Sequence, residues 1–301
     1  MMNTDKVIKK FSSFFLDEKL KERIEKIVVR TAIISFILHL LFIAVVDSHL
    51  LNSPAFKDLT ISPISAIYTP FSIILIYEVY LLVYYLPKSI TNYIGKQYEI
   101  ITLILIRKLF YDLSKLEFSS DWFSIEGDLK FTIDIIATLV LFTLIFLFYK
   151  INAKNKKKGM NLTDKTKRYI RLKKIFASLL VPTVAGLALY SLGNWLYEAS
   201  VDPYALSTSI KSINNIFFDD FFSILILTDV LLLLFSFLQT DEFSRVIRNS
   251  GFIISTVLIK LSFSADGILN AILIVVAVSF GVILLYIYSQ YSKIENSENL
   301  D

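Results

Sequence analysis

Long apolar runs recur along the whole chain, and they constrain its fold more than any other feature. Six of them stand out, at residues 29–47, 65–86, 131–149, 175–197, 221–238 and 268–287. Each is close to the ~20 residues with which an α-helix crosses a bilayer. Hydrophobic residues make up 55% of the chain, too many for a soluble protein of 301 residues. The alternating pattern of a membrane β-barrel is missing from the sequence. We therefore predict an all-α integral membrane protein.

Two shorter apolar runs, at 98–110 and 252–264, decide between six and eight crossings. If both cross, the segments on one side of the membrane hold 24 Lys and Arg residues, and those on the other side hold 3. Such an excess is typical of the cytoplasmic side. We therefore predict eight transmembrane helices with both termini cytoplasmic. The abundance of Ile, Lys and Asn suggests an AT-rich bacterial genome, and hence the plasma (inner) membrane.

The predicted helices fall into two tandem four-helix repeats. We expect an amphipathic cytoplasmic segment at 1–27, a first membrane repeat at 28–150, a Lys-rich cytoplasmic linker at 151–174, a second membrane repeat at 175–289 and a cytoplasmic tail at 290–301. Because each repeat has an even number of crossings, the two must be parallel, with their pseudo-twofold axis along the membrane normal. The third helix of each repeat is predicted to be short.

The repeat is carried by polar residues at matching places. Glu78 in the second apolar run has its counterpart in Asp229, and Arg107 in the next run has its counterpart in Lys260. Acid and base are 29 residues apart in the first copy and 31 in the second. Further matches are Ser72 with Ser223, Thr102 with Ser255, and Asp134 with Asn270.

The four charges Glu78, Arg107, Asp229 and Lys260 are predicted to lie near the membrane midplane. Counting residues from the helix ends places them about 13–16 Å deep. A charge at a helix centre costs about 2.5–3.5 kcal/mol, which pairing or a wet cavity must offset. Two interpretations stay open: ion pairs that hold neighbouring helices together, or charges that line a polar pathway.

Secondary candidates are Asp134, Asn270 and His39. Asp134 and Asn270 lie in the fourth helix of each repeat, where Asp134 could extend a path of carboxylates or pair with Lys130 one turn away. His39, in the middle of the first helix, is interpreted either as a proton relay or, preferably, as a hydrogen-bonded packing residue. The Lys-rich linker could bind anionic lipids, although a role in fixing the topology is the simpler interpretation.

The sequence contains no signature of an enzyme or a cofactor site. It has no cysteine, no nucleotide-binding glycine loop and no histidine cluster for a metal, and no basic-aromatic platform for nucleic acid. The favoured hypothesis is a membrane permeation protein: an ion channel or a proton- or ion-coupled transporter of small solutes, with its charged pairs at the repeat interface. The alternative is a non-transporting scaffold or subunit of a larger membrane complex. The expected partners are the lipid bilayer and an ion or small solute, while a second copy of the chain or another protein stays open.

Overall fold

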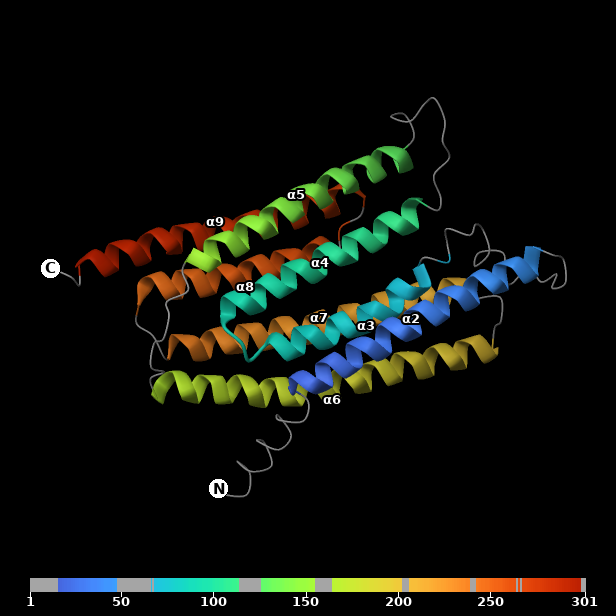
Figure 1. The fold of residues 1–301 in the computed structure, drawn as a ribbon, viewed down its shortest axis with the longest axis horizontal. Helices are drawn as coiled ribbons and strands as arrows, with labels where there is room; N and C mark the ends of the chain where they lie inside the picture. The colour runs from blue at the N-terminus through green and yellow to red at the C-terminus, as the bar shows by residue number, and fades with distance from the viewer. Residues whose placement is uncertain are drawn as a thin grey trace, which may run out of the picture. The chain divides into compact units, whose positions relative to one another are not determined.

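The structure, a computed structural model, describes residues 16–47, 66, 68–113, 126–154, 164–201, 206–238, 242–263, 265 and 267–298. The secondary structure within these residues is helical, and no strand occurs among them. The helices are α2 (Glu18–Asp47), α3 (Tyr68–Tyr85), α4 (Ile90–Leu113), α5 (Glu126–Lys154), α6 (Asp164–Val201), α7 (Leu206–Phe237), α8 (Phe243–Phe263) and α9 (Ile268–Glu298), as Figure 1 shows.

Four helices in the described part of the chain are long and apolar enough to cross a membrane. Their spans are Glu18–Val46, Gly127–Lys154, Phe243–Phe263 and Ile268–Ile294, and two shorter apolar helices cover Thr69–Tyr85 and Phe221–Phe237. Large apolar side chains, such as those of Ile33, Ile37 and Leu41 on α2, are exposed, as expected where lipid takes the place of water. The chain thus has the character of a helical membrane protein. The number of crossings, the tandem repeats and their parallel orientation stay predictions.

All of the described helices except α3 are longer than the apolar runs that predicted them. Helix α4 has 24 residues and α8 has 21, so the prediction of short third helices is wrong. Both helices begin before their apolar runs, because Thr, Asn, Ser and Arg can continue a helix without being apolar. Helix α2 likewise passes through the boundary predicted at residue 28, while residues 1–15 of the predicted amphipathic segment lie outside the described part.

The chain forms two compact units. Unit 1 comprises Met1–Tyr84, Arg107–Leu116 and Ile175–Ile224, and unit 2 comprises Tyr85–Ile106, Glu117–Lys174 and Leu225–Asp301. Helices α4, α6 and α7 each contribute one part to each unit. Each unit therefore contains segments from both predicted repeats, and the division at the Lys-rich linker stays a prediction.

In unit 1, polar contacts join α2 to α3. The ring of His39 forms a hydrogen bond with Thr69, and the Tyr77 hydroxyl donates to Glu25 at 2.9 Å. Phe71 of α3 stacks on Phe110 at the end of α4, with 5.2 Å between ring centroids. These contacts tie the apolar helices of this unit together at several levels.

In unit 2, helix α9 packs against both α5 and α8. A very close approach is at Gly281 of α9, where an added Cβ would overlap the hydroxyl of Tyr98 from α4. That hydroxyl donates to Ser255 of α8 at 2.8 Å, and Ser255 donates to the Ala277 carbonyl of α9 at 2.6 Å. A small residue and shared hydroxyls at one level are the usual means of packing membrane helices closely.

Candidate functional site

Buried and half-buried polar side chains from four helices gather in unit 2. This polar cluster draws one pair of residues from each helix: Tyr93 and Gln97 of α4, Tyr169 and Lys173 of α6, Asp229 and Ser236 of α7, and Arg248 and Asn249 of α8. In the first three helices the two residues are four or seven apart, so both lie on one helix face. The helical repeat itself therefore aligns these side chains on the faces that meet inside the unit.

Asp229 is at the centre of the cluster and is only 2% exposed. Its Oδ2 accepts a hydrogen bond from Gln97 Nε2 at 3.0 Å. The hydroxyl of Tyr93 faces the same carboxylate but falls short of ordinary hydrogen-bond geometry. The positive charge that acts on Asp229 is that of Lys173, and the two groups form no direct ion pair in the described structure. The carboxylate is thus buried with a neutral amide as its principal partner.

Lys173 is buried next to this carboxylate, two residues before the apolar stretch of α6 begins. Its ammonium group donates to the backbone carbonyl of Lys88 at 3.1 Å, and it lies over the Tyr169 ring at 5.0 Å from the centroid. Burial lowers the pKa of Lys173 to about 8, while the charge of Asp229 acts in the opposite direction and that of Arg248 lowers the pKa further. Asp229 is the middle residue of the apolar helix Phe221–Phe237, and it lies level with the basic start of α6, to which Lys173 belongs.

The cluster continues from Asp229 towards the end of α7. The Tyr169 hydroxyl lies beside Ser236 and donates to the Leu232 carbonyl at 3.0 Å. Asn249 Nδ2 donates to Ser236 Oγ at 3.4 Å, and Asn249 Oδ1 accepts from Arg248. Polar groups thus follow one another from the buried carboxylate to Arg248 at the start of α8.

Glu78 and Arg107, the first predicted pair, both belong to unit 1. Glu78 is 7% exposed, and the charge of Arg107 acts on its carboxylate. No direct ion pair joins the two groups within the described residues. The structure therefore brings this acid and base into the same neighbourhood but not into the close contact that a staple between helices would use.

In the second predicted pair, Asp229 does not have the partner that the sequence predicts. The cation that acts on Asp229 is Lys173 and not Lys260, which lies in the last turn of α8. The antiparallel contact between Ser236 and Asn249 explains the difference. Counting seven residues back from Ser236 and seven on from Asn249 places Asp229 opposite residue 256, a full turn short of Lys260.

The secondary candidates occupy separate places. Asp134 is fully buried in α5, and its backbone carbonyl accepts the Thr138 hydroxyl at 2.7 Å. Asn270 donates to the Ser262 carbonyl at 2.6 Å across the turn between α8 and α9. This contact, together with Gly267 at a φ of 64°, closes the turn, and it gives Asn270 a structural part. His39 makes the hydrogen bond to Thr69 that a packing histidine would make.

Of the eight members of the cluster, only Asp229 is among the candidate site residues that the sequence singles out; those it misses include Tyr93, Gln97, Tyr169 and Lys173. The available signal was their spacing of four residues next to apolar runs, but Tyr and Lys near helix ends also anchor helices at membrane surfaces. Within the described residues, no group of three or more His, Cys, Asp or Glu side chains could hold a metal ion. Comparisons with protein-family models, with curated proteins and with solved structures gave no match.

Proposed function

We propose that this protein is a membrane permeation protein, an ion channel or a proton- or ion-coupled transporter of small solutes. Asp229 is the group that binds the proton or cation. The observation that supports this most directly is that Asp229 and Lys173 each form a hydrogen bond with a neutral group and not with one another. Asp229 is bound by the amide of Gln97, and the ammonium group of Lys173 is bound by the Lys88 carbonyl.

A pair of charges that only held helices together would gain most from direct contact. A charge-assisted hydrogen bond between carboxylate and ammonium is about twice as strong as a neutral one. In this cluster the two charges interact without touching, so each stays open to another partner. A carboxylate in this state can accept a proton or a cation and release it again. Intramembrane ionisable groups are functional candidates for the same reason.

The remaining members of the cluster provide a route to Asp229. Tyr169, Ser236, Asn249 and Arg248 follow one another towards the start of α8, which the distribution of Lys and Arg places on the cytoplasmic side. Hydroxyl and amide groups in such a row can pass a proton or replace the water around an ion. In this proposal the protein lies in the plasma membrane with both termini in the cytoplasm.

The test is flux through the purified full-length protein in liposomes. An imposed pH or cation gradient should drive flux through the wild type, and Asp229→Asn should reduce it at least ten-fold. Glu99→Gln is the matched control, because Glu99 is a carboxylate of the same unit that Lys96 and Tyr149 already bind. Flux that is unchanged in Asp229→Asn and in Glu78→Gln would remove both carboxylates from the mechanism.

The alternative of a non-transporting scaffold is separated by exchanging charges in unit 1. If Glu78 and Arg107 only stabilise the packing, the double variant Glu78→Arg, Arg107→Glu should restore the expression and activity that each single charge reversal loses. If the pair lines a pathway, the exchanged protein should fold but transport at a much lower rate. A wild type that folds in liposomes and shows no flux for protons, ions or small solutes would favour the scaffold.

A further inference from the structure

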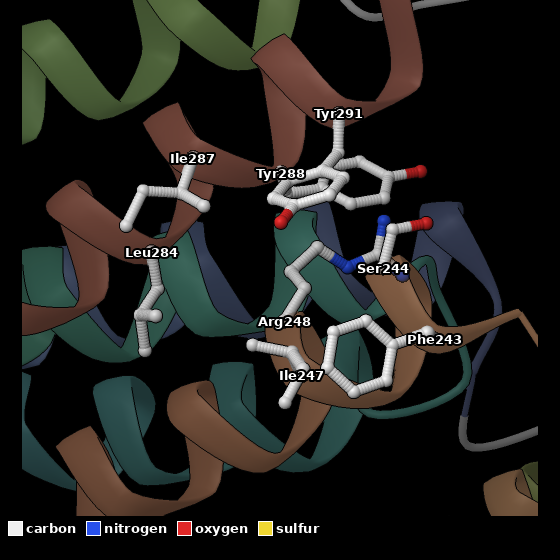
Figure 2. Close-up of a pocket in the computed structure, with 8 residues that line it drawn as sticks. All are labelled: Phe243, Ser244, Ile247, Arg248, Leu284, Ile287, Tyr288 and Tyr291. Atoms are coloured by element: carbon white, nitrogen blue, oxygen red, sulfur yellow. The ribbon is translucent and has the colours of Figure 1, made fainter. Parts of the chain in front are cut away.

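A shallow groove lies between the start of α8 and residues 284–291 of α9. Figure 2 shows Arg248 and Phe243 on the α8 side and Leu284, Ile287, Tyr288 and Tyr291 on the α9 side. Both helices are among those that can cross a membrane, and the groove is at the ends of the two spans. It therefore lies where a helix pair passes from the apolar core of a bilayer to the level of the lipid headgroups.

Arg248 is held in this groove in a fixed orientation. Its guanidinium carbon lies 4.2 Å from the centroid of the Tyr288 ring, and its Nε and Nη2 both donate to Asn249 Oδ1, at 3.1 and 2.9 Å. The carboxylate nearest in sequence, that of Glu242, is bound by Arg245 at 2.7 Å. No carboxylate forms an ion pair with Arg248 in the described structure. The charge of Glu242 acts on Arg248 without direct contact, and a positioned guanidinium that no carboxylate contacts directly is suited to an anion from outside the chain.

The walls of the groove show what kind of anion this is. Phe243 is 67% exposed, and Ile287 and Tyr291 also present large apolar surfaces. A small soluble anion would gain nothing from such walls. An anionic lipid matches both features, because its phosphate reaches the guanidinium while an acyl chain covers Leu284 and Ile287. Tyr288 and Tyr291 supply the aromatic rings that usually flank lipid headgroups.

We propose that this groove binds one anionic phospholipid of the cytoplasmic leaflet through Arg248. The site is distinct from the Lys-rich linker, which the sequence suggests as a lipid-binding segment, and it does not depend on the proposed transport. Asn249 connects it to the polar cluster, since the same side chain accepts from Arg248 and donates to Ser236. The bound lipid would therefore hold one end of the row of polar groups that leads to Asp229.

The test measures the thermal stability of the purified full-length protein in detergent with added lipid. Phosphatidylglycerol should raise the unfolding temperature of the wild type by several degrees, and zwitterionic phosphatidylcholine should raise it by much less. Arg248→Gln should lose most of the phosphatidylglycerol effect. Arg245→Gln is the control, since it removes an equal charge from the same turn of α8 and should keep the effect. Inorganic phosphate at the same concentration should leave the unfolding temperature unchanged.

A second variant keeps the test decisive if Arg248→Gln does not fold. Ile287→Trp fills the apolar wall without touching the guanidinium, and it should abolish the retention of phosphatidylglycerol in native mass spectrometry. An equal response of Arg248→Gln and the wild type to phosphatidylglycerol would overturn the proposal. So would an equal effect of inorganic phosphate, or lipid retention that is unchanged in Ile287→Trp.

Discussion

At the scale of single residues, Lys173 shows how burial and charge oppose one another in the polar cluster. Its side chain is only 3% exposed. In the described structure its ammonium group forms one hydrogen bond, to the backbone carbonyl of Lys88. Asp229 favours the charged form of Lys173, but the loss of water favours the neutral form more strongly. A lysine in this position makes the stability of unit 2 depend on pH.

We predict that stability rises between pH 7.5 and 9.5. The pKa of Lys173 is about 8 in the folded protein and 10.5 ordinarily, so over this range the unfolded chain binds a proton that the native state lacks. The free energy of unfolding therefore increases with pH, by at most about 3 kcal/mol. Below pH 8 the lysine is charged in both states, and the cost of burying the charge is fully present.

Denaturation of the detergent-solubilised protein at several pH values measures this dependence. Lys173→Met should flatten the curve, because it removes the group that titrates. Lys174→Met, a change in the exposed neighbour, should leave the slope as it is in the wild type. A wild-type stability that stays level or falls over this range would contradict the prediction.

At the scale of helices, the close packing of α4, α8 and α9 depends on Gly281. We predict that Gly281→Ala destabilises the protein by about 1–3 kcal/mol, because the added methyl group overlaps the Tyr98 hydroxyl and displaces it from Ser255. The control is Gly127→Ala in α5, where an added Cβ meets no atom within 4 Å. Thermal unfolding in detergent measures both variants.

A double variant isolates the cause. Tyr98→Phe alone should cost about 0.6 kcal/mol, the average for a hydrogen bond between membrane helices. Combined with Tyr98→Phe, the Gly281→Ala change should cost less than it does in the wild type, since the clashing oxygen is gone. Additive losses, or a Gly281→Ala protein as stable as Gly127→Ala, would show that the contact does not control this packing.

The helices themselves could be predicted from the sequence, because apolar runs of about 20 residues have few other solutions in a bilayer. Their ends could not, since the first turns of α4 and α8 are polar and continue the helix without a hydropathy signal. The burial of Glu78 and Asp229 was also foreseeable from their apolar neighbours. The partner of Asp229 was not, because it depends on the register between α7 and α8 and on which face of α6 turns inward.

At the scale of the whole molecule, the eight predicted crossings can be tested directly because the chain contains no cysteine. Single cysteines placed on either side of α4 and α8, the two helices in doubt, report their own side of the membrane. Suitable positions are Ser89 and Ser120 around α4, and Glu242 and Ala265 around α8. The excess of Lys and Arg predicts that Ser89→Cys and Glu242→Cys face the cytoplasm.

Labelling with a membrane-impermeant maleimide in intact cells and in inverted vesicles measures the side of each cysteine. Ser120→Cys and Ala265→Cys should react in intact cells, and Ser89→Cys and Glu242→Cys should react only in inverted vesicles. If α4 did not cross, Ser89→Cys and Ser120→Cys would react on the same side, and the same holds for the pair around α8. Either outcome would change the number of crossings between α3 and α9, and two parallel four-helix repeats would no longer be compatible with the topology. If all four cysteines react as expected, Arg248 and the start of α8 lie on the cytoplasmic side, so the lipid groove and the row of polar groups leading to Asp229 open towards the cytoplasm.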